Sequence, residues 1–166
     1  MGTGKTTVGR HLAALLRRRF LDLDDVVTQR AGRSVPDIFR SDGEAGFRRL
    51  EHEALLQVVG EGGVVIATGG GAACREPNLS LMLERARVVA LWASPEEVIR
   101  RTGAGAPSGR PLLDGAADPV AAARALLAAR EPFYRRAHLR VETEGKRPEQ
   151  IADEIALALG KETDKS

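Results

Sequence analysis

The stretch Gly2-Thr3-Gly4-Lys5-Thr6-Thr7 decides how the rest of this sequence is interpreted. It matches the end of the phosphate-binding loop GxxxxGK[ST], in which glycines let backbone N–H groups point at the phosphates of a nucleotide. The lysine adds a positive charge, the threonine hydroxyl after it can ligate Mg²⁺, and the N-terminus of the following helix favours an anion. The alternative is a glycine-rich helix start that binds nothing.

The motif is incomplete in this sequence. Its first glycine, and the strand that precedes such a loop, would both fall before Met1. We therefore expect a sheet that lacks its N-terminal central strand, through a misassigned start codon or a truncation.

Composition places the chain among ordinary globular domains. It has 166 residues, of which 43% are hydrophobic and 29% are charged, so we expect one domain over 1–166. No apolar run approaches the roughly 20 residues that span a bilayer, and we see no signal peptide. A single cysteine is typical of a reducing compartment, so we expect a cytoplasmic protein.

The charges argue against a nucleic-acid partner. Lysine and arginine number 25 and the acids 23, so the bases are balanced by acids. Aromatic residues make up only 4%, which leaves few side chains to stack on bases.

Hydrophobic patterning predicts an α/β fold. The runs 64–67 and 88–92 are continuously apolar, as in strands buried on both faces of a parallel sheet. Because helical segments alternate with the strands, we expect a doubly wound parallel sheet with helices on both faces. The expected strands are 20–23, 64–67, 88–92 and 138–142; the expected helices are 5–18, 25–31, a short one from 34, then 41–59, 79–85, 95–102, 118–135 and 148–159. We expect residues 103–117 to form a long loop and 160–166 a disordered tail.

Acidic side chains follow the first expected strand. Side chains alternate along a strand, so Asp22 and Asp24 share a face. Two carboxylates beside a triphosphate suit two tasks. One can hold a water molecule of the Mg²⁺ shell, and the other can accept or orient the proton of an attacking hydroxyl. The alternative is a strand end with Asp24 or Asp25 as a helix cap.

Arginines and glycines supply the other candidate groups. Adjacent residues on a helix point about 100° apart, so only one of Arg48 and Arg49 can face a site. If Arg130 faced the same cleft, two arginines would bind a carboxylate through paired hydrogen bonds. Gly69-Gly70-Gly71 allows a ligand to approach the backbone, and Arg110 lies in the long loop, which is typical of a lid.

Together these motifs resemble the shikimate kinase family over nearly the whole chain. The matching pieces are the loop 1–9, 21–24, 32–34 with Ile38-Phe39, 47–51, 68–71, 110–113, and Arg130 with Pro132 and Tyr134. The resemblance implies a P-loop fold like that of nucleoside-monophosphate kinases and transfer of a phosphoryl group from ATP to the 3-hydroxyl of shikimate. It also implies Mg²⁺, a cytoplasmic monomer, and a place in aromatic amino-acid biosynthesis.

The resemblance implies roles for individual residues. Asp24 would bind the shikimate hydroxyls and act as the base, and Lys5 and Arg110 would neutralise the transferred phosphoryl group. The remaining implied sites are ATP binding by Gly2, Thr3, Gly4, Lys5, Thr6, Thr7, Arg101, Arg110 and Pro148; shikimate binding by Arg48, Gly69, Gly70, Gly71 and Arg130; and metal binding by Thr6 and Asp22.

Two departures and two alternatives accompany this resemblance. Thr28 stands where the family usually has glutamate, and the segment 103–109 is a few residues longer than usual. A gluconate or nucleoside-monophosphate kinase would use the same scaffold. A non-catalytic nucleotide- or nucleic-acid-binding module is the alternative from another class.

Overall fold

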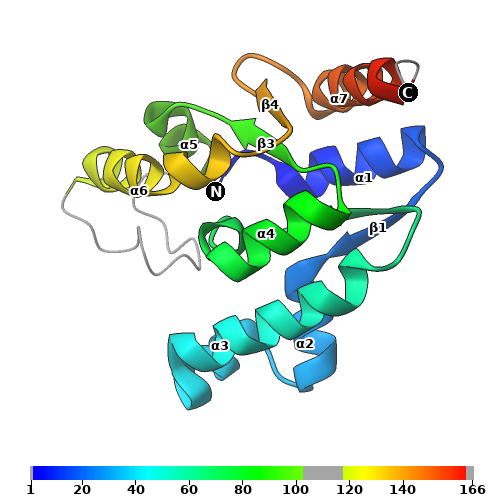
Figure 1. Cartoon of the computed structure of the whole chain (residues 1–166). Helices are drawn as coiled ribbons and strands as arrows, with labels where there is room; N and C mark the ends of the chain where they lie inside the picture. Colours follow the sequence, from blue (N-terminus) through cyan, green and yellow to red (C-terminus); the bar gives the residue numbers. More distant parts are fainter. Residues whose placement is uncertain (1, 103–117, 164–166) are drawn as a thin grey trace.

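The computed structural model describes residues 2–102 and 118–163, without the side chains of 161–163. Within these ranges strands and helices alternate along the chain (Figure 1). The strands are β1 (Arg19–Asp22), β2 (Val64–Ala67), β3 (Val89–Trp92) and β4 (Leu139–Glu142). The helices are α1 (Lys5–Leu15), α2 (Leu23–Ala31), α3 (Val35–Val59), the short η1 (Ala72–Cys74), α4 (Glu76–Arg85), α5 (Pro95–Thr102), α6 (Pro119–Tyr134) and α7 (Pro148–Thr163).

The strands form two parallel pairs. β1 pairs with β2, with Phe20 opposite Val65, and β3 pairs with β4, with Ala90 opposite Arg140. Each pair joins strands that are distant in sequence, which requires helical crossovers and confirms the predicted parallel α/β class. In the described ranges β2 and β3 are not paired with each other.

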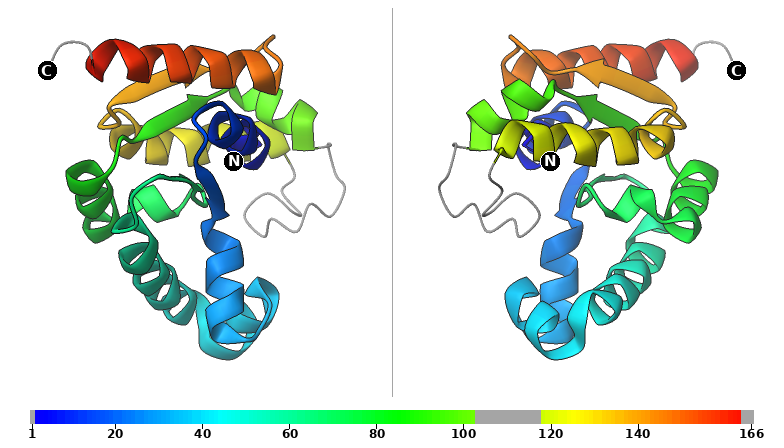
Figure 2. Two further views of the ribbon diagram at one scale, coloured as in Figure 1. Left: turned by 90° about the vertical axis from the view of Figure 1, so that its right-hand side faces the viewer. Right: turned by 90° about the vertical axis from the view of Figure 1, so that its left-hand side faces the viewer.

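Helices pack around the strand pairs. Helix α1 packs against α7 and β2, while α2 lies along α3. Figure 2 shows α2 and α3 projecting together from the end of β1, away from β3 and β4. A hydrogen bond between Thr6 and Asp22 places the N-terminus of α1 beside the end of β1.

Local signals in the sequence start and stop the helices at the expected places. Ser34 caps α3 by accepting a hydrogen bond from the Asp37 N–H, and Asp118 caps α6. Gly32 ends α2 with φ 62°, a left-handed conformation that glycine adopts without strain. Gly43, with φ 69°, breaks the helical geometry within α3, which agrees with two predicted helices meeting there.

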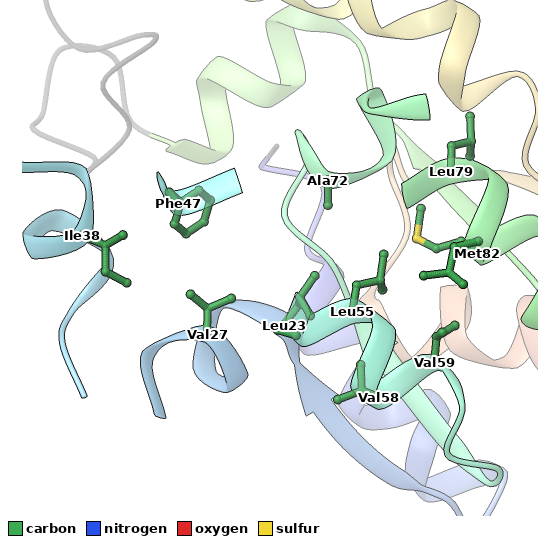
Figure 3. Packing of buried hydrophobic residues seen from close by; sticks show 12 residues of the cluster. Leu23, Val27, Ile38, Phe47, Leu55, Val58, Val59, Ala72, Leu79 and Met82 are labelled. Carbon is green, nitrogen blue, oxygen red and sulfur yellow. The ribbon is translucent and has the colours of Figure 1, made fainter. Parts of the chain in front are cut away.

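Two large apolar clusters form most of the core, and Ile99 and Ala123 form a third, small one between α5 and α6. The larger one joins α2, α3, η1 and α4; Figure 3 shows Leu23, Leu55 and Leu79 within it. The other large one lies between α1, α7 and the β3–β4 pair, and contains Val8, Leu12 and Ile155.

Some predictions about these elements are wrong. Three of the four residues of β2 and all four of β3 are only half-buried, because each strand is paired along one edge. Helix α4 begins at Glu76 rather than 79. Helix α7 extends to Thr163, so residues 160–163 of the expected tail are helical rather than disordered.

The expected lid, 103–117, and residues 164–166 lie outside the described residues. In the described part of the chain, the helices are too short or too polar to cross a bilayer.

Candidate active site

The phosphate-binding motif forms a tight loop that leads into α1. Gly2 and Gly4 have φ values of 67° and 80°, which side chains rarely adopt, and Gly4 caps the helix. Thr3 between them is buried, and Lys5 is the first residue of α1. The loop therefore has the backbone shape and the helix N-terminus that bind an anion.

The two predicted metal ligands are in direct contact. The Thr6 hydroxyl donates a hydrogen bond of 2.9 Å to Oδ2 of Asp22. The other oxygen, Oδ1, accepts from the backbone N–H of Asp24 at 3.2 Å, so Asp22 is the N-cap of α2.

This arrangement corrects the prediction for the acidic pair. Asp24 lies in the first turn of α2 rather than on the strand, because Asp22 ends β1 and starts the helix. The cap is Asp22, not Asp24 or Asp25. Strand alternation therefore does not explain why Asp22 and Asp24 are neighbours; the helix turn does.

The donor set around Asp22 fits Mg²⁺. Hydroxyl and carboxylate oxygens are ligands that Mg²⁺ prefers, and it usually keeps several waters and phosphate oxygens besides one or two protein groups. Among the described residues, no group of three or more His, Cys, Asp or Glu side chains forms a ligand cluster. Thr6 and Asp22 are thus suited to an ion that arrives with a nucleotide, rather than to one caged by protein.

Asp24 interacts electrostatically with residues of both the phosphate-binding loop and helix α3. Burial raises the pKa of its carboxyl group, and the nearby Asp22 raises it further. The positive charges of Lys5 and Arg48 oppose this rise. The charge of Asp24 therefore interacts both with the phosphate-binding lysine and with the α3 arginine.

Only one arginine of the α3 pair faces this site, as predicted. The Arg48 side chain is 15% exposed, whereas that of Arg49 is 70% exposed and lies 3.9 Å from Glu53. Arg48 donates from Nη1 to both carboxylate oxygens of Glu51, at 3.1 and 3.0 Å, and from Nη2 to Glu44 at 3.2 Å.

Glu51 was not predicted to have a role. Its side chain is 1% exposed, and burial raises its pKa while Arg48 opposes that rise. A buried glutamate three residues after an arginine on a helix is a recognisable ion-pair spacing. That spacing was visible in the sequence, but only the structure shows that the pair is buried.

The glycine segment after β2 packs directly against these charged groups. A Cβ atom on Gly71 would lie 2.7 Å from Nη2 of Arg48, so a side chain there would displace the guanidinium. A Cβ on Gly69 would make ordinary contacts, 3.5 Å from Oδ1 of Asp24 and 3.6 Å from Oε1 of Glu51. The segment thus borders both Asp24 and Arg48.

Arg130 approaches the same segment from α6. Tyr134, one turn further on, donates a 2.7 Å hydrogen bond to the carbonyl oxygen of Gly70. Burial raises the pKa of Tyr134 to about 12, against the opposing effect of Arg130. Burial also raises the pKa of Cys74, while Arg130 and then Arg48 lower it. The charges of both arginines therefore act on the segment that carries Gly70 and Cys74.

A buried polar network supports the turn that follows the glycines. Asn78, 1% exposed, donates a 3.1 Å hydrogen bond to the carbonyl oxygen of Ala72 in η1. Its Oδ1 lies 2.6 Å from Nδ1 of His52 on α3. Sequence reasoning missed this network, because neither residue stands in a motif.

Arg101 and Pro148 border one loop. Arg101 donates from Nη1 to the Thr143 hydroxyl at 3.0 Å and from Nη2 to its carbonyl oxygen at 2.7 Å. Glu97 accepts from Arg101 Nε at 2.6 Å. The loop that begins at Thr143 ends at Pro148, the first residue of α7. Arg101 therefore contacts the start of this loop, and Pro148 lies at its end. Arg110 lies outside the described residues.

Comparisons with known proteins agree with one another. A family model described as shikimate kinase matches residues 1–159. A shikimate kinase of Thermus thermophilus is 45% identical over 159 residues, covering 96% of this chain and 85% of the relative. One of Bordetella pertussis is 49% identical over 134 residues, covering 81% of this chain and 62% of the relative.

Solved structures show the same likeness. The shikimate kinase from Acinetobacter baumannii in complex with shikimate superposes with a TM-score of 0.89 at 40% identity, covering 97% of this chain and 89% of that one. The shikimate kinase from Aquifex aeolicus gives a TM-score of 0.83 at 37% identity, covering 98% and 94%.

Proposed function

This chain belongs to the shikimate kinase family, and from that premise we propose that it transfers the terminal phosphoryl group of ATP to the 3-hydroxyl of shikimate. The product, shikimate 3-phosphate, leads to chorismate and the aromatic amino acids. The observation that supports the proposal is the grouping of Asp24, Lys5 and Arg48: Asp24 and Arg48 both border the segment 69–71, and the charge of Lys5 opposes the rise in the pKa of Asp24.

The acceptor half of the site suits a hydroxylated carboxylic acid. Arg48 borders Gly71, and Arg130 lies one turn before Tyr134, which contacts Gly70, so the two arginines could bind the carboxylate of the acceptor through charge-assisted hydrogen bonds. Asp24 would bind acceptor hydroxyls and accept the proton that leaves during transfer. Its raised pKa suits that task, because a stronger base accepts a proton more readily.

The donor half of the site suits the phosphates of ATP. Gly2, Gly4 and the N-terminus of α1 would bind phosphate oxygens, and Lys5 would neutralise charge as it develops. Mg²⁺, when bound with ATP beside Thr6 and Asp22, would neutralise the negative charge of the phosphates. Little covalent chemistry falls to the protein, so positioning and charge supply the catalysis.

The remaining assignments belong to the same proposal. Arg101 and Pro148 border the loop where the adenine would lie, and Arg110 would be the arginine of a lid that reaches the transferred group after closure. We further propose that the protein acts as a monomer in the cytoplasm.

The decisive experiment is an acceptor panel. ADP release is coupled to a spectrophotometric readout with shikimate, gluconate or a nucleoside monophosphate as the sole acceptor, with and without Mg²⁺. We expect turnover with shikimate alone, and only when Mg²⁺ is present. Turnover with gluconate or a nucleotide in place of shikimate would reject the proposed acceptor. ATP binding without turnover on any acceptor would favour the non-catalytic module.

A further inference from the structure

The turn after β2 is held by its own backbone at two of its three glycines. The carbonyl oxygen of Gly69 accepts a hydrogen bond of 3.1 Å from the N–H of Ala72, and that of Gly71 accepts one of 3.1 Å from the N–H of Cys74. Among the described residues, no backbone N–H donates to the carbonyl oxygen of Gly70, which lies between them. The Gly70–Gly71 peptide group therefore depends on side chains for its orientation.

Two side chains donate to the carbonyl oxygen of Gly70. The hydroxyl of Tyr134 on α6 lies 2.7 Å away, and the thiol of Cys74 lies 3.4 Å away. A thiol is a weak donor, so the phenol is the stronger partner. Tyr134 is 64 residues distant in sequence and half-buried, so the peptide group is fixed by a tertiary contact.

The direction of this carbonyl also sets the direction of the N–H of Gly71. The described peptide bonds are all trans, and in a planar trans peptide the C=O and the N–H point in opposite directions. Because the carbonyl of Gly70 points to Tyr134, the N–H of Gly71 points away from it. Gly71 also borders the guanidinium of Arg48. Within the described chain this N–H has no acceptor, so it is a donor available to a ligand beside that arginine.

The same contact holds the part of α6 that carries Arg130. Arg130 and Tyr134 are four residues apart, so they lie on the same face of the helix. The charge of Arg130 acts on both the phenol of Tyr134 and the thiol of Cys74. Pro132 between them has no N–H and removes one hydrogen bond of α6. The hydrogen bond from Tyr134 to Gly70 therefore anchors a turn of helix that proline weakens.

We propose that Tyr134 is a positioning residue for the phosphoryl acceptor. Its hydroxyl fixes the Gly70–Gly71 peptide group so that the N–H of Gly71 faces the bound acid, and it keeps Arg130 at a set distance from that N–H. The phenol acts through the glycine segment and through α6, not by contact with the acceptor. The inference rests on the proposed function, since it assigns Tyr134 to binding of the proposed acceptor.

Tyr134→Phe tests this role, because it removes the hydroxyl and keeps the ring. Loss of one hydrogen bond to Gly70 should raise the KM for shikimate about three- to tenfold, with the KM for ATP within about twofold. Cys74→Ala, which removes the weaker donor to the same oxygen, should raise it less. Amide exchange of Ala72, which donates within the turn, should become severalfold faster in Tyr134→Phe.

Phe133→Leu is the matched control for a purely structural effect. Phe133 is the neighbour of Tyr134 on α6 and packs against the larger apolar cluster. This variant should lower the melting temperature at least as much as Tyr134→Phe, yet leave the KM for shikimate within about twofold. A lowered melting temperature with an unchanged KM in Tyr134→Phe would overturn the proposal. An equal rise of the KM in Phe133→Leu would also overturn it, since general loosening of α6 would then suffice.

The original chain is measured in parallel, and shikimate binding is followed by calorimetry as well as by turnover. If the original chain neither binds nor phosphorylates shikimate, the proposed function itself fails and Tyr134 has no such acceptor to position. If the original chain binds shikimate and Tyr134→Phe binds it equally well, only the role of Tyr134 fails. Weaker binding by Tyr134→Phe alone supports the proposal.

Discussion

Nη1 of Arg48 donates hydrogen bonds to both carboxylate oxygens of Glu51, one turn along α3, and the glutamate is almost completely buried. A buried carboxylate is costly unless it is paired, so each residue keeps the other in place. This pairing orients the remaining N–H groups of Arg48 toward Gly71. The ion pair therefore serves to position the arginine as well as to satisfy the glutamate.

Replacing Glu51 by glutamine should weaken shikimate binding. The neutral amide cannot pair with Arg48 as strongly, so the guanidinium loses its fixed orientation. We expect the KM for shikimate to rise about tenfold, equivalent to about 1.4 kcal/mol, with the KM for ATP nearly unchanged. Arg48→Ala should have a larger effect of the same kind.

Arg49→Ala is the matched control for both variants, because Arg49 is the next residue on α3 and its side chain is largely exposed. Its kinetic constants should stay within about twofold of those of the original chain. An equal rise in the KM for ATP in Glu51→Gln would contradict the positioning role.

Gly71→Ala should also impair shikimate binding. The added Cβ would lie 2.7 Å from Nη2 of Arg48, and Glu51 resists the shift that this contact requires. We expect a severalfold rise in the KM for shikimate with little change in the melting temperature. Gly62→Ala is the control, since a Cβ there meets nothing within 4 Å. If both variants bind shikimate equally well, Gly71 does not need to be glycine.

Asn78→Ala should destabilise the fold. The change leaves the carbonyl oxygen of Ala72 and the ring of His52 without their buried partner, at a cost of about 1–3 kcal/mol. Urea unfolding measures this loss directly. Ser80→Ala, which removes an exposed 3.0 Å hydrogen bond to Glu76 on the same helix, should change stability by less than about 0.5 kcal/mol. Similar losses in the two variants would show that the buried network contributes little.

Glu97 should make the fold sensitive to acid. Hydrogen bonds from Arg100, together with Arg101, lower its pKa from 4.5 to about 2. Because the folded carboxyl binds its proton less readily than the unfolded one, its stabilising effect is complete above about pH 4.5 and is lost as the pH falls toward 2.

Melting temperatures measured across this acid range test the effect. Glu97→Gln should be less stable at neutral pH and should lose less stability on acidification, because the titrating group is gone. The exposed Glu84→Gln on α4 should follow the original chain throughout. A Glu97→Gln profile parallel to that of the original chain would exclude this origin of acid sensitivity.

Local sequence signals were sufficient for much of the fold. The caps Ser34 and Asp118, the stop at Gly32 and the strand 64–67 were all predictable, because each depends on residues only a few positions apart. The strand–helix alternation likewise indicated a parallel α/β fold. The position of the cap Asp22 was missed, because competing aspartates stood within three residues of one another.

What the sequence determined by itself was the phosphate-binding loop, the order of the elements and the set of candidate charged residues. These depend on backbone preference and on spacing along the chain. The resemblance had already indicated Arg48 rather than Arg49. Only the tertiary structure decided that Glu51 is buried against Arg48 and that Tyr134 reaches Gly70 from α6. Those outcomes depend on how each helix is rotated against its neighbours, and that rotation is set by packing between segments up to 64 residues apart.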